Sequence, residues 1–429
     1  MNRFQAAELN NMASTEMTFA PRPYLLVNKI QHYVWGTRGK DAFIPRFLGL
    51  EAEPGRPYAE LWIGAHIKAP SDVVLDGSAV SLRQLLSQYP LEILGEGVAR
   101  RFSGSLPFLF KVLSAAEALS IQVHPSKEQA RVLHARDPEH YPDDNHKPEL
   151  VIALDSLMAL IGFKSFSGIL QTLENYPELA DLIGEDVCHE LRDLRNPSPL
   201  EQREYVRRIY STLVSRSLSH PEGLAEASSR LSERLGAATG GLSEEERLFL
   251  ALERQYPASD VGLFSLFLLN LVHLKKGQGM FIKAGIPHAY LKGNVVECMA
   301  NSDNVVRVGL TPKFKDAGTL VKILDYEPRA VSALEGVPDS ERIIYRTSAS
   351  EFQVSLWKLA SGMERREATE GKPIVFLISK GNVLFIWDVG LESGEQVFHQ
   401  GQSVLIPACL KEFRLRAQSA VELFEVEVP

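Results

Sequence analysis

Four candidate metal ligands lie far apart in this chain, and their separation constrains the fold more than any other feature. Gln122 and His124 are two residues apart, so on a strand their side chains point from the same face. Glu149 and His288 follow much later. Two imidazoles, one carboxylate and one amide oxygen can hold a metal such as Zn²⁺ with one position open. Three of these residues precede a helical block and His288 follows it. If they share one metal, the β regions on both sides belong to one domain.

Each candidate ligand also has a plainer interpretation. A single Gln-x-His pair is often an ordinary polar strand face, and an isolated histidine is more often structural than a ligand. His146 competes with Glu149 as a ligand. Because adjacent strand residues point to opposite faces, His146 and Lys147 cannot both face the metal. The run 279–288, with a glycine, a short apolar stretch and then Pro-His, resembles the second metal motif of cupins and favours the metal interpretation of His288.

Composition excludes several classes of function. The 429 residues, 45% of them hydrophobic, are enough for two or three domains. A formal net charge of -8 indicates no general affinity for nucleic acid or anionic membranes, so no nucleic-acid or membrane partner is expected. The three cysteines are far apart and form no disulfide framework or zinc ribbon, and a reducing cytoplasm is the expected location. The most apolar stretch, 261–274, is too short to span a bilayer.

Short apolar runs between Gly, Pro and Asp predict strands in residues 24–162, for example at 24–27, 61–63, 108–113 and 150–154. Residues 163–260 are predicted to be helical, because Ser198-Pro199-Leu200-Glu201 and Ser243 are strong signals for the start of a helix. Residues 271–282 fit a hairpin with its turn at Lys276-Gly277. Regularly spaced strands at 374–378, 383–387, 403–406, 412–415 and 421–428 suit a sandwich or jelly roll.

Charged residues follow His288 closely. Glu297, Asp303 and Arg307 lie within one short run, and a second run contains Lys313. One interpretation is a polar turn with a basic surface. The other is a site in which cations hold an anionic group and a titratable group moves a proton. The residues alone leave the two interpretations about even.

Several motifs, taken in order, resemble the type I mannose-6-phosphate isomerases (phosphomannose isomerases). The resemblance covers most of the chain and is weakest in the helical block and before residue 24. Its motifs are Tyr33-Val34-Trp35-Gly36, Tyr58-Ala59-Glu60-Leu61-Trp62-Ile63-Gly64, Leu119-Ser120-Ile121-Gln122-Val123-His124-Pro125, Asn145-His146-Lys147-Pro148-Glu149, Pro287-His288-Ala289-Tyr290, Glu297-Cys298-Met299-Ala300 and Asn304-Val305-Val306-Arg307-Val308-Gly309-Leu310-Thr311-Pro312-Lys313.

The resemblance implies an isomerase with one Zn²⁺ per chain that interconverts mannose 6-phosphate and fructose 6-phosphate through an enediol. The implied zinc ligands are Gln122, His124, Glu149 and His288. Arg307 is implied as the active-site arginine, and the implied substrate-binding residues are Lys111, Ser120, Tyr290 and Lys313. The group that moves the proton stays open among Glu297, Asp303, Lys147 and a metal-bound hydroxide. The expected partner is a small sugar phosphate, and a monomer is expected.

The expected fold class is mainly β with an α-helical domain. A flexible extension is expected at residues 1–23. The resemblance implies a catalytic cupin, or jelly-roll, domain formed by 24–162 and 262–328. Residues 163–261 would be a helical insertion, and 329–429 a second, C-terminal jelly roll. Two rival functions are an iron-dependent cupin oxygenase and a sugar-phosphate-binding protein without catalysis.

Overall fold

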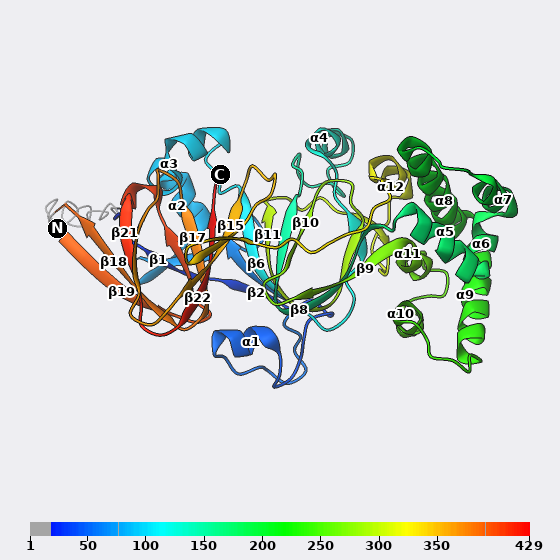
Figure 1. Ribbon diagram of the computed structural model, residues 1–429. Helices are drawn as coiled ribbons and strands as arrows, with labels where there is room; N and C mark the ends of the chain where they lie inside the picture. The colour runs from blue at the N-terminus through cyan, green and yellow to red at the C-terminus, as the bar shows by residue number, and fades with distance from the viewer. Residues whose placement is uncertain (1–18, 76, 391) are drawn as a thin grey trace, which may run out of the picture.

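The computed structural model describes residues 19–75, 77–390 and 392–429 (Figure 1). Helices make up 30% and strands 33% of the described residues, so the fold is mixed α and β, with a smaller excess of strand than the expected mainly β chain with an α-helical domain. Figure 1 shows the strands gathered at one end and in the centre, with a group of helices at the other end.

The first sheet contains strands from both ends of the chain, and we call it the terminal sheet. Its β1 pairs with β20 on one side and β4 on the other. Sheet membership therefore crosses the boundary expected near residue 329. In spatial order the strands are β13 (Val337–Asp339), β14 (Arg342–Tyr345), β15 (Gln353–Leu359), β22 (Val421–Glu427), β17 (Ile374–Lys380), β20 (Ser403–Ile406), β1 (Tyr24–Val27), β4 (Asp72–Leu75) and β5 (Ser78–Ser81).

The second sheet, called the central sheet, is built around one long strand. Its main order is β10 (Gly279–Ile282), β8 (Glu149–Phe163), β11 (His288–Ala300), β6 (Phe108–Ala115), β3 (Glu60–Gly64) and β2 (Lys29–Gln31), with β9 (Leu269–Lys275) on β8 and β7 (Ile121–Val123) between β11 and β12 (Val306–Gly309). The predicted hairpin at 271–282 is wrong. Because β8 is long enough for two partners, β9 and β10 each pair with it at different positions.

The central sheet bends strongly. In the pairing of β8 with β11, Ile161 lies opposite His288, whereas Glu149 lies opposite Met299 at the other end. A straight strand would separate Glu149 from Ile161 by about 40 Å. The side chains of Glu149 and His288 nevertheless approach to 3.2 Å. The pairing has register shifts around Gly293, whose φ is +138°. A Cβ at this position would collide with the backbone of Ser156 and Leu157 on β8. Such bulges bend a sheet, and this bend brings its two ends together.

The remaining strands form a small outer sheet in the order β16 (Glu364–Ala368), β21 (Glu412–Ala417), β18 (Asn382–Val389) and β19 (Glu392–His399). Four helices and one 3-10 turn lie against the sheets or at their ends: α1 (Phe43–Leu48), α2 (Leu82–Gln88), α3 (Pro90–Arg101), α4 (Lys127–Arg136) and η1 (Ala408–Leu410).

A block of helices separates β8 from β9 along the chain. It comprises α5 (Phe166–Asn175), α6 (Pro177–Ile183), α7 (Glu185–Asp193), α8 (Pro199–Ser219), α9 (Pro221–Gly236), α10 (Glu244–Glu253) and α11 (Gly262–Leu268), and α12 (Ala317–Ile323) packs nearby. The predicted starts at Ser198 and Ser243 are confirmed as N-caps with complete capping boxes. The block shares one apolar core with β7 and β12, so it supports the central sheet from one side.

The predicted N-terminal extension lies largely outside the described residues, which begin at Phe19. The Phe19 ring stacks on Tyr24 at 5.0 Å and on Tyr89 at 5.4 Å between ring centroids. Residues 19–23 therefore enter the fold along an aromatic contact.

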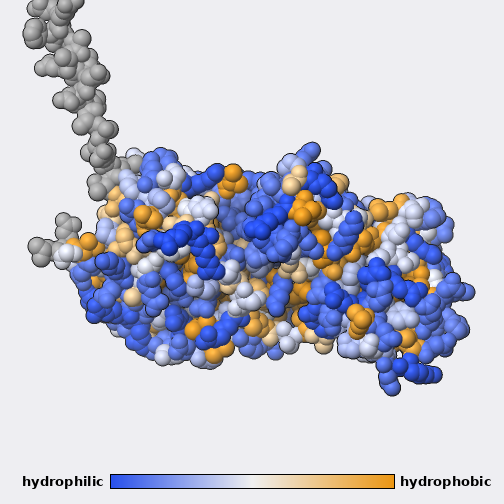
Figure 2. Space-filling view, turned by 90° about the horizontal axis from the view of Figure 1, so that it is seen from above, coloured by the Kyte–Doolittle hydropathy of each residue, from blue (hydrophilic) through white to orange (hydrophobic). Residues whose placement is uncertain are grey.

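Figure 2 shows a face on which hydrophilic residues are interspersed with small hydrophobic areas. None of the helices in the described part of the chain combines the length and apolar character that a bilayer crossing needs.

Glu425 is a buried carboxylate in the terminal sheet, and its protonation should affect stability. Its Oε2 accepts a hydrogen bond from Trp357 Nε1 at 2.8 Å and lies 3.5 Å from a guanidinium nitrogen of Arg342. Arg342 favours the charged form, but burial outweighs it and Glu427 adds repulsion. The pKa of Glu425 is therefore raised from 4.5 to about 7.

Because this pKa is higher in the folded than in the unfolded protein, stability is lost as pH rises through the window from 4.5 to about 7. From pH 5 to pH 8, the unfolding free energy should fall in both proteins or in the parent alone. We expect the decrease to be roughly 2–3 kcal/mol smaller in Glu425→Gln than in the parent protein. Denaturant titrations at both pH values measure this difference. Glu395→Gln, at an exposed strand position, is the control. Parallel pH profiles for Glu425→Gln and the parent would contradict the prediction.

Candidate metal centre and active site

Three buried side chains converge where the central sheet bends. His124 Nε2 lies 3.3 Å from Glu149 Oε1, and His288 Nε2 lies 3.2 Å from Glu149 Oε2. All three side chains are at most 1% exposed, and their ligand atoms lie within 4.8 Å of one another. Ligands on one tetrahedral Zn²⁺ are about 3.4 Å apart, so this spacing fits three ligands around one ion.

Strand pairing places Gln122 beside this group. Gln122 lies directly opposite His288 on one side and Arg307 on the other. Directly opposed residues of antiparallel strands share a face, so these three side chains form one row. The amide Nε2 of Gln122 is 3.4 Å from His288 Nε2. Turning the amide would present its oxygen instead, as ligation requires. Gln122 therefore lies where the predicted ligand should be, and its ligation stays a prediction.

Apolar packing on the back of β7 holds this row in place. Ile121 and Val123 flank Gln122, are fully buried and belong to the core that includes the helical block. Burial of each of these side chains stabilises the fold by about 1.5–3 kcal/mol. A one-residue slip of β7 would turn Gln122 into that core, so the register is strongly determined.

Both histidines are oriented by backbone carbonyl groups. Nδ1 of His124 donates to the carbonyl of Asn304 at 2.8 Å, and Nδ1 of His288 donates to that of Ile286 at 3.0 Å. Both Nε2 atoms then carry lone pairs that face Glu149. Burial lowers the pKa of His124 to about 4, which keeps its ring neutral. Its buried Nε2 has no hydrogen-bond partner among the described residues. A lone pair that faces a carboxylate at this distance needs a cation between them, so the group fits a metal.

Asp143 organises the loop that orients His124. Its carboxylate accepts hydrogen bonds from Ser302 Oγ at 2.7 Å, from the backbone N–H of Asp303 at 2.7 Å and from Asn304 Nδ2 at 3.0 Å. Asn304 is fully buried, and its carbonyl oxygen is the acceptor for His124. Asp143 thus stands two contacts away from the metal group. It lies within a polar loop, and its local sequence does not reveal this role.

A chain of buried acids and bases continues from Glu149. Lys147 Nζ lies 3.2 Å from Glu149 Oε1, whereas His146 turns the other way and contacts Glu351 at 2.8 Å. The prediction that His146 and Lys147 face opposite sides is confirmed. The hydroxyl of Tyr290 donates to Glu297 Oε1 at 2.8 Å and lies 3.4 Å from Glu149 Oε2. Predicted substrate-binding and catalytic residues are therefore in contact with a candidate ligand.

Lys111 lies between two carboxylates. Its Nζ is 3.3 Å from both Glu60 Oε2 and Glu297 Oε2, and it also packs over the ring of Trp62. Burial alone would lower the pKa of Lys111, but Glu60 and Glu297 outweigh burial and raise it. For Glu297, burial and then Glu149 raise the pKa against the opposing effect of Lys111. The charge of Lys111 is already balanced, so these contacts do not favour its predicted role in phosphate binding. Glu60 was not predicted from the sequence.

Asp303 belongs to a separate cluster. Its carboxylate contacts Lys68 Nζ at 2.8 Å and His66 Nε2 at 3.4 Å. Burial would raise the pKa of Asp303, but His66 and Lys68 outweigh it and lower the pKa. These three residues border a cleft of about 860 Å³ that also reaches Asp143. A carboxylate that contacts two basic side chains is a weak proton acceptor. This disfavours Asp303 as the general base.

Arg307 and Lys313 differ from Lys111, Lys147 and Asp303, because neither side chain has an ion-pair partner among the described residues. Partial burial lowers the pKa of Arg307. Partial burial also lowers that of Lys313, and nearby Arg307 lowers it further. Two neighbouring cations without a carboxylate partner form a ready site for an anionic group. Ser120 immediately precedes β7 and is only partly buried.

The comparisons agree with this geometry. The sequence model of one protein family, the phosphomannose isomerase type I catalytic domain, matches residues 24–166. Over 319 residues, the chain is 42% identical to mannose-6-phosphate isomerase of Rattus norvegicus, with 72% of this chain and 74% of the rat protein covered. The chain belongs to the type I phosphomannose isomerase family. The resemblance predicted from the motifs is confirmed.

Other relatives extend the match. The mannose-6-phosphate isomerase of Mus musculus is 37% identical over 86% of this chain and 89% of its own length. A crystal structure of a variant phosphomannose isomerase from Salmonella typhimurium has a TM-score of 0.82 and 32% identity, and covers 95% of this chain and 99% of its own. A zinc-bound mannose 6-phosphate isomerase structure has a TM-score of 0.81 with the same identity and coverage. The chain is an isomerase of this family, and its His124–Glu149–His288 group can hold a metal ion.

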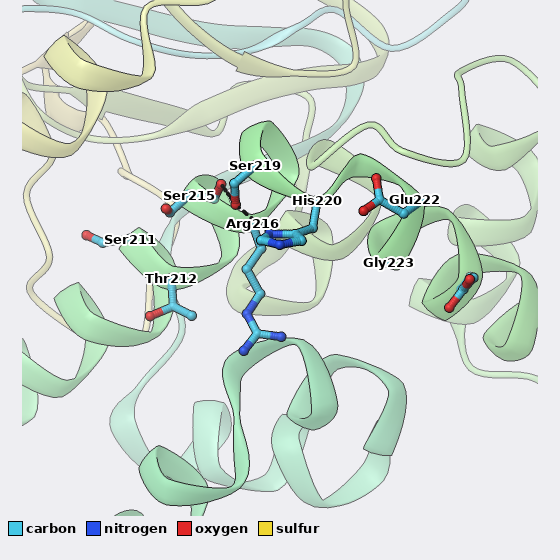
Figure 3. A pocket seen from close by; sticks show the side chains of 9 residues that line it. Ser211, Thr212, Ser215, Arg216, Ser219, His220, Glu222 and Gly223 are labelled. Atoms are coloured by element: carbon cyan, nitrogen blue, oxygen red, sulfur yellow. Dashed lines mark hydrogen bonds between the residues drawn. The ribbon is translucent and has the colours of Figure 1, made fainter.

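A hollow of about 800 Å³ on the helical block is a different kind of feature (Figure 3). Ser219 Oγ donates to the Ser215 carbonyl at 3.0 Å and contacts His220 Nδ1 at 2.8 Å, while the Arg216 side chain extends away from them. Two carboxylates, Glu222 and Glu226, also line the hollow, against the single guanidinium of Arg216. Among the described residues, the group that could hold a metal ion lies at the central sheet and not in this hollow.

Removing Asp143 should weaken the metal centre without touching it. We expect Asp143→Ala to bind metal about 10–100-fold more weakly, because the loop that holds the Asn304 carbonyl loses its anchor. Chelator competition measures the affinity, and circular dichroism checks the fold. Asp144→Ala is a matched control, because Asp144 is exposed and its carboxylate pairs with Lys127 at the surface. Equal metal affinity in the Asp143→Ala and Asp144→Ala variants would contradict this positioning role.

Proposed function

We propose that the protein is a zinc-dependent aldose–ketose isomerase that interconverts D-mannose 6-phosphate and D-fructose 6-phosphate through an enediol. The observation that carries the proposal is the register row of His288, Gln122 and Arg307. This row joins the buried candidate metal ligands to Arg307, a cation that has no ion-pair partner among the described residues. One side of the row suits an electrophile, and the other suits an anionic substrate.

The proposed ligands are His124, Glu149 and His288, with Gln122 as the fourth. Zn²⁺ held there would supply a Lewis acid that stabilises negative charge on the sugar oxygens. Three neutral ligands and one carboxylate leave the centre positively charged, as that chemistry requires. The zinc-bound relative supports the choice of metal.

Arg307 and Lys313 are proposed to meet the substrate's negative charge. Arg307 lies opposite Gln122 in register, which supports a role in stabilising charge that develops during proton transfer. Lys313 and Ser120 are proposed to hold the phosphate. A phosphate held at a distance from the reacting carbons positions C1 and C2, so its binding energy contributes to catalysis.

Glu297 and Lys147 are the protein groups proposed for the proton transfer between C1 and C2. Both lie within a chain of contacts that includes Glu149. A raised pKa moves Glu297 towards the range in which a carboxylate can both accept and return a proton. Tyr290 and Lys111 hold its two oxygens and are proposed to fix its orientation.

We also propose how the sheets form domains. The central sheet, bent around the metal group, is the cupin-type catalytic domain, and residues 163–261 are the helical domain. The terminal and outer sheets form the second jelly roll. The pairing of β1 with β20 supports the addition of N-terminal strands to that second unit. Monomeric state and cytoplasmic location stay predictions.

A coupled assay tests the function directly. Mannose 6-phosphate is supplied, and fructose 6-phosphate is followed with and without prior removal of metal by a chelator. We expect turnover that falls by at least about 100-fold after chelation and returns with Zn²⁺. Activity that is insensitive to chelation, or no activity on any hexose 6-phosphate, would overturn the proposal. Oxygen uptake by an iron-loaded sample would instead support an oxygenase.

Arg307→Ala separates catalysis from metal binding. We expect turnover to fall about 10²–10³-fold, because a charged donor next to the reacting oxygens is lost. The zinc content should match that of the parent. Among the described residues, Arg307 makes no contact with His124, Glu149 or His288. Arg203→Ala, at an exposed position on α8, is the control. Near-normal turnover in Arg307→Ala would exclude the proposed role.

A further inference from the structure

A second cationic site lies away from the metal centre, at the junction of the terminal and central sheets. It is a cleft of about 440 Å³ beside α1, the helix that lies below the two sheets in Figure 1. One carboxylate, Glu422, and four cationic side chains line it: Arg46, Lys276, Lys358 and Lys380. The chain as a whole carries a net charge of -8, so this concentration of positive charge is local.

Strand register brings three of these charges together. Glu422 on β22 lies directly opposite Lys358 on β15 and opposite Lys380 on β17. Lys276, in the turn before β10, approaches the Glu422 carboxylate to 2.8 Å. Lys358 and Lys380 have no ion-pair partner within residues 19–75, 77–390 and 392–429. Because β15 and β17 are interior strands, their lysines do not serve to protect a sheet edge.

The floor of the cleft is apolar. Leu356 and Phe424 lie two residues inward from Lys358 and Glu422 on the same strands and belong to the core between the two sheets. Phe43 and Leu154 add partly exposed apolar surface. The volume lies in the range of small-molecule sites and is too small for a polynucleotide.

We propose that this cleft binds a small organic anion that carries two phosphoryl groups, such as a nucleoside diphosphate or a sugar bisphosphate. Such an anion has about three negative charges at neutral pH and matches four cations set against one carboxylate. Its base or sugar ring would lie on the apolar floor. Ammonium groups on flexible stems and an arginine from α1 can converge on phosphoryl oxygens.

The site is separate from the metal centre but adjoins it along one strand. Ala153 and Leu154 line the cleft, and Glu149 lies at the start of the same strand, β8. The turn that carries Lys276 leads into β10, whose last residue pairs with Glu149. None of the residues that line the cleft belongs to the proposed catalytic machinery, so binding there can be tested independently of turnover.

Isothermal titration of the full chain tests the proposal, with ADP and fructose 1,6-bisphosphate as alternative probes and adenosine as the uncharged comparison. We expect at least one of the two phosphorylated probes to bind with Kd below about 100 µM. Combined Lys358→Glu and Lys380→Glu should weaken that binding at least tenfold and leave turnover unchanged. Combined Lys40→Glu and Lys322→Glu, at exposed positions elsewhere, should leave binding unchanged.

The probe that binds identifies the source of the phosphoryl groups. Retained binding in the double lysine variant, equal binding of adenosine, or failure of both phosphorylated probes would overturn the proposal. Loss of binding in Arg307→Ala would place the probe at the metal centre and would also overturn it. If the charge-reversal variant does not fold, Lys358→Gln with Lys380→Gln provides the same comparison.

Discussion

The antiparallel pairing of β8 with β11 is the contact on which the rest of the structure depends. It joins residues 149–163 to residues 288–300 and is interrupted by register shifts near Gly293. These shifts let two long strands curve until Glu149, at the start of one, meets His288, at the start of the other. β6, β7, β9 and β10 all pair with one of the two strands. The geometry of the metal group is therefore a property of the whole bent sheet.

The buried charges fall into two groups with different physical roles. Lys111, Lys147, Glu149 and Glu297 neutralise one another through short contacts, as buried charges must to offset their loss of hydration. Arg307 and Lys313 lack such partners in the part of the chain that the structure describes. An unpaired, partly buried cation costs stability and is retained when a ligand completes it. This contrast supports the proposal that Arg307 and Lys313 meet the anionic part of the substrate.

Much of the site could be predicted from the sequence, because local motifs report residue type and spacing. His124, Glu149 and His288 were predicted to share one metal, and they converge; the helix starts at Ser198 and Ser243 were visible in their capping boxes. Long-range pairing was not visible. Nothing local shows that β9 and β10 both pair with β8, or that β1 joins the strands near the C-terminus.

The contacts of Glu60, Asp143 and His66 escaped prediction for the same reason. Each depends on a partner from a distant segment: Glu60 meets Lys111, Asp143 meets the loop at 302–304, and His66 meets Asp303. A polar residue on a strand or in a loop has the same local sequence whether its partner is water or a distant loop. Charge type is local information, whereas charge pairing is a result of topology.

The place of β11 in the chain has a consequence for synthesis on the ribosome. About 125 residues separate the end of β8 at Phe163 from the start of β11 at His288. While that segment is synthesised, β6 and β8 each have an edge without its partner strand. The helices that follow β8 can already form from local contacts. Exposed strand edges invite association with other chains. The nascent protein thus passes through a long interval in which its helical end can be folded while its central sheet is open. The order of the strands along the chain therefore keeps the central sheet open until residues 288–300 have been made.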